Sequence, residues 1–309
     1  MYDGTKFRMW YTGQNASGNA MIGYATSPDG FAWTKNPNPV LLLGQARAWD
    51  SSDVASGSVV WNGTLFLMWY AGKSNSTESN GLAFSSDGIS WTKYQGNPVM
   101  MSVSHDIYPY VIRVGNTYKM WYTEGTFPTL WIDSAASADG IHWTKNPGTA
   151  LEPDAAYGQP NSWDGVGIYS PSVIYNGSAY WMWYTGGSKV TNLATIGYAT
   201  SKDGVTFNSW TKSPDNPIVS QGPAGAWDSY DYIQYPDAIV VDNGVMLYYS
   251  AIQRAANGTY VSEKIGLAQS PQGFSVAELP FPTLTLLLGV MLLTTAAVTR
   301  RFRSNHSSS

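Results

Sequence analysis

The chain contains no cysteine and few charged residues. With 0 cysteines in 309 residues, it can form neither a disulfide framework nor a cysteine-based metal site. Charged residues make up 12% of the chain, and its formal net charge is −4. A protein that binds nucleic acid needs a basic surface, so this balance argues against nucleic acid as a partner.

Histidine is also scarce, and helical periodicity is missing before residue 279. The chain holds 3 histidines, too few for a His-rich metal site. Loop aspartates could offer oxygen ligands to calcium, but no loop shows a spaced run of such ligands, so we expect no cofactor. Apolar residues do not recur at helical spacing before residue 279, whereas aromatic residues make up 14% of the chain. This composition is typical of a rigid all-β protein.

One segment recurs along the chain, and its best copy runs from Tyr169 to Lys212. An apolar run and an aromatic run flank Asn176-Gly177, and two later runs flank Asp203-Gly204. Both dipeptides are typical of two-residue type I′ hairpin turns, in which both central residues take positive φ. Each copy is therefore predicted to fold as four antiparallel strands in a meander.

The Met-Trp-Tyr motif marks the copies. It begins at Met9, Met68, Met120 and Met182, and Leu247 begins its fifth form, so the spacings are 52 to 65 residues. A four-stranded unit repeated at this period predicts a radial array. We expect an all-β, five-bladed β-propeller over residues 1–278, with blades at about 1–43, 44–101, 102–151, 152–220 and 221–278.

The first copy is incomplete. The chain begins Met1-Tyr2-Asp3-Gly4, and Asp3-Gly4 aligns with Asn176-Gly177, so the first blade is predicted to lack its inner strand. An open strand edge along the channel is a liability that proteins avoid. Either the segment after Gly273 supplies this strand or the natural start lies upstream. We favour an upstream start, because no signal peptide precedes Tyr2.

Residues 279–309 differ from every copy of the repeat. Residues 283–299 form an uncharged apolar run of 17 residues, near the lower limit for a transmembrane helix. An arginine cluster at 300–303 follows, and because Lys and Arg stay cytoplasmic, the propeller is expected on the extracellular face of the membrane or envelope. A proline-containing motif, an apolar span and an arginine cluster together resemble the C-terminal sorting tails of the PEP and PEF type. We therefore expect a C-terminal membrane anchor.

The meander places the variable loops and the links that enter the inner strands on one face, here called the loop face. A rigid scaffold usually carries its function on such loops. Four acids of this face are the catalytic candidates: Asp53, Asp106, Glu124 and Asp231. Asp106 and Glu124 share one copy with His105, and crowded carboxyls would raise one pKa for acid–base work. Solvated loop acids are the alternative interpretation of all four.

Repetition separates structural from functional side chains. The recurring Trp-Asp pairs contain Asp50, Asp164 and Asp228, which we expect to hydrogen-bond backbone in the links between blades. The tryptophan of the Met-Trp-Tyr motif is expected to pack between blades. Aromatic residues that are not repeated can stack on sugar rings. The substrate-binding candidates are therefore His105, Tyr108, Trp131 and Tyr235.

The repeated pattern Met-Trp-Tyr-Thr-Gly, then Ile-Gly-Tyr-Ala-Thr-Ser, resembles the five-bladed propellers of glycoside hydrolase families 43 and 32, which include arabinanase-, levansucrase- and invertase-like enzymes. The resemblance covers residues 2–277 and implies a glycan or polysaccharide ligand. It also implies acids at the start of inner strands, one of which precedes a proline; one acid protonates the leaving oxygen and another attacks or activates water. Here the pre-proline positions hold Tyr108, Ser170 and Tyr235, and Ser56 precedes Gly57. The acid pattern of the family is therefore not evident in this chain.

Three functions stay open from the sequence. The first is a propeller anchored at the cell surface that binds or processes carbohydrate. The second is an active glycoside hydrolase that uses Asp106 and Glu124. The third is a structural or adhesive envelope protein, because a fold alone does not give a function.

Overall fold

The computed structural model describes residues 1–74, 78–101, 108–126, 129–154, 162–188, 191–206, 209–241, 244–254 and 260–269. The named elements in these ranges are all strands, and no helix there is long and apolar enough to cross a membrane. The all-β prediction is therefore confirmed for the described part of the chain. The predicted membrane span at 283–299 lies outside it.

The strands follow the copies of the repeat. Copy one (1–43) holds β1 (Phe7–Gln14), β2 (Ala20–Ser27) and β3 (Thr34–Lys35). Copy two (44–101) holds β4 (Asp53–Trp61), β5 (Phe66–Lys73), β6 (Glu78–Ser85), β7 (Thr92–Lys93) and β8 (Met100–Met101). Copy three (102–151) holds β9 (Tyr110–Val114), β10 (Thr117–Thr126), β11 (Thr129–Ser137) and β12 (Thr144–Lys145). Copy four (152–220) holds β13 (Gly167–Tyr175), β14 (Tyr180–Gly187), β15 (Ala194–Ser201) and β16 (Trp210–Lys212). Copy five (221–278) holds β17 (Tyr232–Val241), β18 (Gly244–Arg254) and β19 (Tyr260–Gln269).

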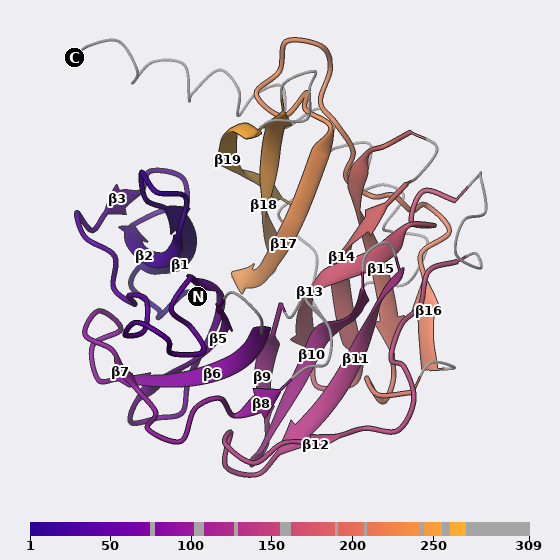
Figure 1. Cartoon of the computed structure of the whole chain (residues 1–309). Helices are drawn as coiled ribbons and strands as arrows, with labels where there is room; N and C mark the ends of the chain where they lie inside the picture. Colours follow the sequence, from indigo (N-terminus) through magenta and orange to yellow (C-terminus); the bar gives the residue numbers. More distant parts are fainter. Residues whose placement is uncertain are drawn as a thin grey trace.

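The strands within each copy pair in antiparallel fashion, as the meander predicts, and the short β8 of copy two pairs with β6. In copies two, three and four, four strands pair in chain order. Short parallel contacts join neighbouring copies, at Leu130 with Gly167 and at Ala194 with Tyr232. The copies stand around a common centre (Figure 1). This curled arrangement has the form of a β-propeller.

The hairpin turns differ from the predicted type. Tyr175 pairs with Tyr180, so the loop between β13 and β14 has four residues, and only Gly177 takes positive φ (95°). The Asn176 Oδ1 accepts hydrogen bonds from the backbone N–H groups of Ser178 and Ala179 at 2.9 and 2.8 Å. The asparagine therefore closes the turn with its side chain, and the prediction of a type I′ turn was wrong.

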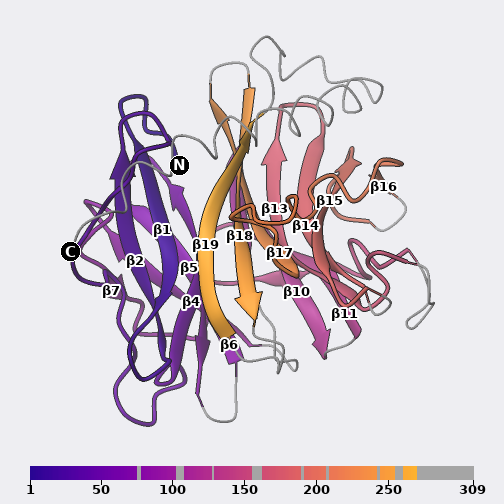
Figure 2. The ribbon, with the colours of Figure 1, turned by 90° about the horizontal axis from the view of Figure 1, so that it is seen from above.

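The tryptophans of the Met-Trp-Tyr motif lock each copy to the next. Their indole N–H groups donate to the carbonyl of the Asp-Gly glycine in the following copy. The pairs are Trp10 with Gly88 at 2.8 Å, Trp69 with Gly140 at 2.8 Å and Trp121 with Gly204 at 2.7 Å. In copy five the Tyr248 hydroxyl takes this role and donates to the Gly30 carbonyl of copy one at 3.0 Å. Copies five and one are therefore in contact, with β18 and β19 beside β1 and β2 (Figure 2).

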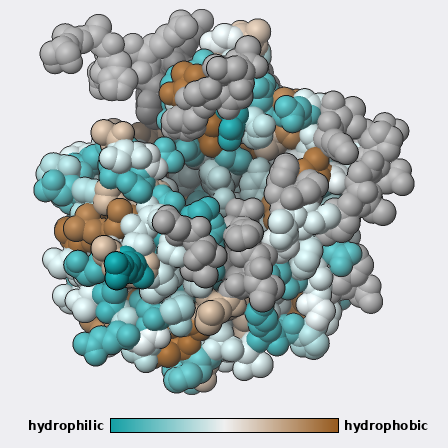
Figure 3. Space-filling view, in the orientation of Figure 1, coloured by the Kyte–Doolittle hydropathy of each residue, from teal (hydrophilic) through white to brown (hydrophobic). Residues whose placement is uncertain are grey.

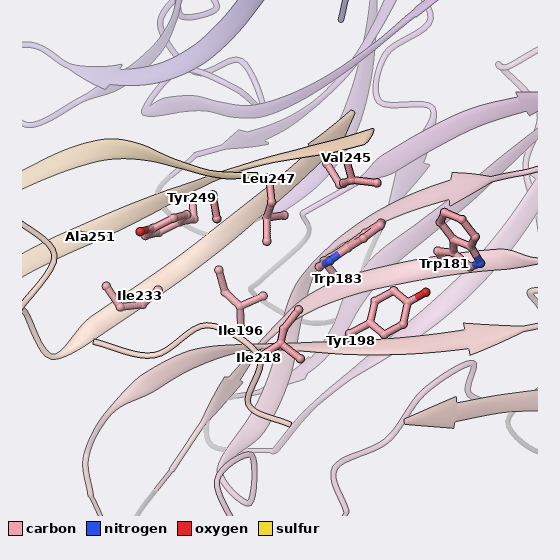
Figure 4. Close-up of a cluster of buried hydrophobic side chains, with 12 residues drawn as sticks. Trp181, Trp183, Ile196, Tyr198, Ile218, Ile233, Val245, Leu247, Tyr249 and Ala251 are labelled. Atoms are coloured by element: carbon pink, nitrogen blue, oxygen red, sulfur yellow. The ribbon is translucent and has the colours of Figure 1, made fainter. Parts of the chain in front are cut away.

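The core is divided among the interfaces between copies. Between copies four and five, Trp183, Ile196 and Tyr198 pack against Leu247 and Tyr249 (Figure 4). Each such cluster excludes water from aromatic surface, which stabilises the fold by about 1.5–3 kcal/mol for each fully buried side chain. On the face of the molecule drawn in Figure 3, apolar residues gather only in small patches. The predicted packing role of the repeated tryptophans is confirmed.

Copy one starts with two residues that pair with β1. Tyr2 forms a bridge with Phe7, and the Met1 carbonyl accepts a hydrogen bond from the Arg8 backbone N–H at 2.9 Å. The other copies have an inner strand at this side of the sheet. The Asp3 Oδ1 accepts from the N–H groups of Thr5 and Lys6, as Asn176 does in its own turn. The predicted alignment of Asp3-Gly4 with Asn176-Gly177 is therefore confirmed.

Candidate functional site at the channel mouth

Hydrogen bonds confirm that the loops after the second strands and the links between copies share one face. The backbone N–H of Ala20 donates to the Asp53 Oδ1 at 2.7 Å, and the Asn19 amide donates to the Ser52 carbonyl at 2.9 Å. The N–H of Ala194 donates to the Asp231 carbonyl at 2.9 Å. Of the predicted catalytic acids, Asp53 thus ties copy two to copy one, whereas the side chain of Asp231 is exposed.

The aspartates of the Trp-Asp pairs are structural, but their partners are side chains more than backbone. Asp50 is buried, accepts a hydrogen bond from the Tyr70 hydroxyl at 3.0 Å and pairs with Lys93 at 2.6 Å. Asp164 pairs with Lys212 at 2.7 Å, in the same place in copy four. Because Tyr70 and Lys93 belong to the repeat, this arrangement recurs with it. The expected backbone role was incomplete.

A β-bulge interrupts the inner strand of several copies at one position. The pairing register shifts between Ala55 and Ser58, between Tyr169 and Ser172, and between Gln234 and Asp237. Inside these bulges, Ser56, Ser170 and Tyr235 take φ values of 52°, 52° and 56°. Left-handed backbone is costly for residues other than glycine, and it is found where the surrounding structure holds it, frequently at functional sites.

A threonine of the preceding copy holds each of these strained residues. Its Oγ1 accepts the backbone N–H of the bulge residue. The pairs are Thr12 with Ser56 at 3.0 Å, Thr123 with Ser170 at 3.1 Å and Thr185 with Tyr235 at 3.1 Å. This threonine is the fourth residue of Met-Trp-Tyr-Thr-Gly, so the repeat itself contains the support of the bulge. Copy two has Ala71 at this position and lacks the hydroxyl.

Three tyrosines meet at this level and are here called the tyrosine cluster: Tyr169 lies in β13, Tyr235 lies in β17, and Tyr108 lies two residues before β9. The ring centroids of Tyr108 and Tyr235 lie 5.5 Å apart, and Tyr169 lies 6.4 Å from Tyr108 and 6.5 Å from Tyr235. The Tyr169 hydroxyl donates to the Gln234 Oε1 at 2.9 Å. Each ring is half-buried. The structure therefore brings together two predicted substrate-binding residues, Tyr108 and Tyr235, and adds Tyr169.

Sequence reasoning missed Tyr169 although a signal was present. Tyr169 directly precedes the bulge residue Ser170, and in copy five the residue before the bulge is Gln234. Among the five copies, an aromatic side chain at this position occurs in copy four. A comparison of the copies at the residue that precedes Ser170 and its equivalents would have identified Tyr169.

Two further predicted site residues, Glu124 and Trp131, lie on the flank of copy three that faces copy two. Glu124 is buried and pairs directly with Trp131 across β10 and β11, and its Oε2 lies 3.2 Å from the Lys145 Nζ. Asp133 lies on the same flank, opposite Tyr122. Burial and the nearby Glu124 carboxyl raise the pKa of Asp133 to about 6, although Lys145 opposes the rise. Two carboxyls with Trp131 and Lys145 thus form a second polar group on the loop face.

Asp133 was also missed, and its signal lies in the repeat. The equivalent residue is a glycine in the other copies: Gly23, Gly81, Gly197 and Gly266. The predicted residues His105 and Asp106 lie outside the described residues. Among the residues that the structure describes, no group of three or more His, Cys, Asp or Glu side chains could hold a metal ion.

Comparison with known proteins supports a glycoside hydrolase-like scaffold. The chain is 29% identical over 255 residues to uncharacterized proteins of Mycobacterium tuberculosis from the CDC 1551 and H37Rv strains, covering 76% of this chain and 80% of theirs. A thermostable family-43 glycoside hydrolase is similar in structure, with a TM-score of 0.69, 16% identity, and coverage of 91% of this chain and 93% of that one. A glycosyl hydrolase from Bacteroides ovatus has a TM-score of 0.65, 19% identity, and coverage of 88% and 82%.

At such identities the solved structures show the fold alone, but a family model matches most of the chain. The model for the glycosyl hydrolases family 32 N-terminal domain matches residues 1–127 and residues 110–261. The two overlapping matches agree with a chain built from repeated copies. The chain therefore belongs to the family of the glycosyl hydrolases family 32 N-terminal domain.

Proposed function

We propose that this chain is a five-bladed β-propeller that binds a glycan at the mouth of its central channel. The observation that carries the proposal is the tyrosine cluster, in which Tyr108, Tyr169 and Tyr235 come from three different copies of the repeat. Half-buried tyrosines combine a flat apolar face with a hydroxyl, which suits the faces and hydroxyls of a sugar. Strained backbone under Tyr235 further supports a ligand-binding role.

Binding comes before hydrolysis in this proposal because of the residues at the pre-proline position. The resemblance to families 43 and 32 implies an acid there, whereas the chain has Ser56, Tyr108, Ser170 and Tyr235. Hydroxyls and aromatic rings hold sugars but do not supply the two carboxyls that glycoside hydrolysis needs. The family relationship supports the glycan as the class of ligand, because the solved relatives are described as glycoside hydrolases.

We further propose that the propeller stands outside the cell, anchored through residues 283–299. The uncharged apolar run followed by the arginine cluster supports this placement. Protease treatment of intact cells should remove the propeller and leave cytoplasmic proteins whole. Protection of the propeller in intact cells would contradict the external placement.

Hydrolysis is the second candidate function, and Asp133 favours it. A carboxyl with a pKa of about 6 next to the Glu124 carboxyl is the kind of pair that glycoside hydrolases use as acid and nucleophile or base. Asp106, in the same copy, is the further acid that the sequence offers. Release of reducing sugar that is lost in Glu124→Gln would support this function.

The test is a glycan array together with a reducing-sugar assay on the full chain in detergent, with arabinan, xylan, fructan and mannan as substrates. Tyr108→Ala and Tyr235→Ala should each weaken glycan binding by about fivefold or more, since an aromatic contact contributes about 1 kcal/mol or more. Tyr175→Ala is the matched control, because Tyr175 is exposed beside the Asn176-Gly177 turn at the other end of β13. Binding that is unchanged in both channel variants would contradict the proposal.

A further inference from the structure

Copy three departs from the repeat at one place in the fold. In copies two and four a tryptophan of the link covers two glycines of the same copy. A Cβ on Gly72 would lie 2.2 Å from the Trp49 ring, and one on Gly186 would lie 2.2 Å from the Trp163 ring. The second glycines, Gly81 and Gly197, are covered by the same tryptophans, at 2.7 and 2.4 Å. The tryptophan thus requires both glycines.

In copy three, acids replace both glycines. Glu124 stands at the position of Gly72 and Gly186, and Asp133 at the position of Gly81 and Gly197. Two carboxyl side chains therefore stand where copies two and four leave room for an indole ring.

The facing side of copy two departs from the repeat as well. Ile22, Ile132 and Ile196 are fully buried, and each packs into the apolar cluster at the interface with the next copy. Copy two has Asn80 at this position, also fully buried. Its amide approaches the Met120 Sδ at 3.9 Å. Met120 lies two residues before Tyr122, so both side chains are on the same flank of β10.

Three buried polar atoms of this interface have no hydrogen-bond partner among the described residues: the Asn80 Oδ1, the Tyr122 Oη and the Asp133 Oδ1. The equivalent tyrosines of copies two and five have partners. Tyr70 donates to Asp50 at 3.0 Å, and Tyr249 donates to Asp228 at 2.9 Å. Tyr122 is fully buried. Buried polar groups without partners are rare in folded proteins and call for a ligand or water.

The chemistry of the group selects the class of ligand. The three atoms without hydrogen-bond partners are mainly acceptors, so a ligand must bring hydroxyl or N–H donors. Lys145 lies 3.2 Å from Glu124 and offsets its charge, which disfavours a metal ion. The carboxyl groups disfavour phosphate. Trp131, half-buried beside Glu124, offers a flat apolar face. A neutral ligand rich in hydroxyl groups fits these conditions.

We propose that the interface between copies two and three binds one sugar unit, at a site separate from the tyrosine cluster. Asn80, Tyr122 and Asp133 form its polar floor and wall, and Trp131 with Lys145 forms its rim. The proposal rests on the proposed function only for the chemical class of the ligand. A glycan held at two places on the loop face would bind more tightly than at either one alone.

The experiment uses the full chain in detergent, labelled with ¹⁵N, and follows the indole N–H resonance of Trp131, assigned through Trp131→Phe. The probes are the methyl glycosides of arabinose, xylose, fructose and mannose. At least one of them should shift this resonance in a saturable manner. Asn80→Ile and the double variant Glu124→Gly with Asp133→Gly restore the residues of the other copies, and they should weaken this binding by about tenfold or more. Tyr175→Ala, at an exposed residue at the other end of β13, should leave it unchanged.

The outcomes separate this site from the channel mouth. Loss in the interface variants with binding kept in Tyr235→Ala supports the new site, whatever happens at the tyrosine cluster. A Trp131 resonance that no probe shifts, or shifts that persist in Asn80→Ile, would overturn it. Should the double glycine variant fail to fold, Asn80→Ile decides alone, since isoleucine is the residue at this position in the four other copies.

Discussion

The threonine that supports the bulge residue offers a sharp test of how the repeat positions the tyrosine cluster. The Thr185 Oγ1 accepts the backbone N–H of Tyr235 at 3.1 Å, and Thr185 is fully buried. Tyr235 has a φ of 56°, a conformation that costs about 1–3 kcal/mol and needs the surrounding structure to hold it. Removing the acceptor leaves a partly buried N–H without a partner, which costs about 1–3 kcal/mol.

Thr185→Val keeps the shape of the side chain and removes the acceptor. We expect it to lower the free energy of unfolding by about 1–2 kcal/mol, measured by urea denaturation, and to weaken glycan binding because Tyr235 is free to leave its position. Thr185→Ser keeps the hydroxyl and should lose less than about 1 kcal/mol, mainly for the missing methyl group. Equal stability and equal glycan affinity in the two variants would refute the reasoning.

Three further predictions concern other parts of the molecule. Asp50→Ala should lower the free energy of unfolding by about 3 kcal/mol, because Asp50 is buried and its removal leaves the Lys93 charge without its partner. A loss below about 1 kcal/mol in chemical denaturation would contradict this prediction. Trp69→Phe should lower the free energy of unfolding by about 2 kcal/mol in the same assay, because the indole donor to the Gly140 carbonyl and part of the ring are lost. A variant as stable as the parent would contradict a stabilising role of this contact between copies. The pKa of Asp133 is raised to about 6, so between about pH 4 and about pH 6 the native state binds more protons than the unfolded state. The free energy of unfolding should therefore fall as the pH rises through this range, by about 1 kcal/mol after solvent screening. Asp133→Asn should remove this pH dependence in thermal melts, and a slope that persists would assign it to another group.

The sequence was sufficient to predict the all-β class and the packing between copies, because each copy of the repeat contains the residues that make these contacts. The Met-Trp-Tyr motif predicted strands that pack between copies, and the indole N–H of Trp121 donates to Gly204 in the next copy. Turn positions were also predicted, but not their geometry. Asn176 closes its turn with a side-chain oxygen, and dipeptide statistics do not distinguish this from a type I′ turn with positive φ at both residues.

The site could be predicted only in part, because its residues come from different copies. Tyr108 and Tyr235 were identified by their place before a proline, and the structure brings their rings together. Tyr169 joins them through the bulge, whose displacement of the chain no linear pattern reveals. Asp133 is visible only when the copies are compared position by position and the glycine is found to be missing.

The most direct test of glycan binding at the channel mouth is a crystal structure of this chain with the oligosaccharide that binds best on the array. We predict a sugar ring in van der Waals contact with at least two tyrosines of the cluster Tyr108, Tyr169 and Tyr235. A bound oligosaccharide that contacts none of the three would contradict the account.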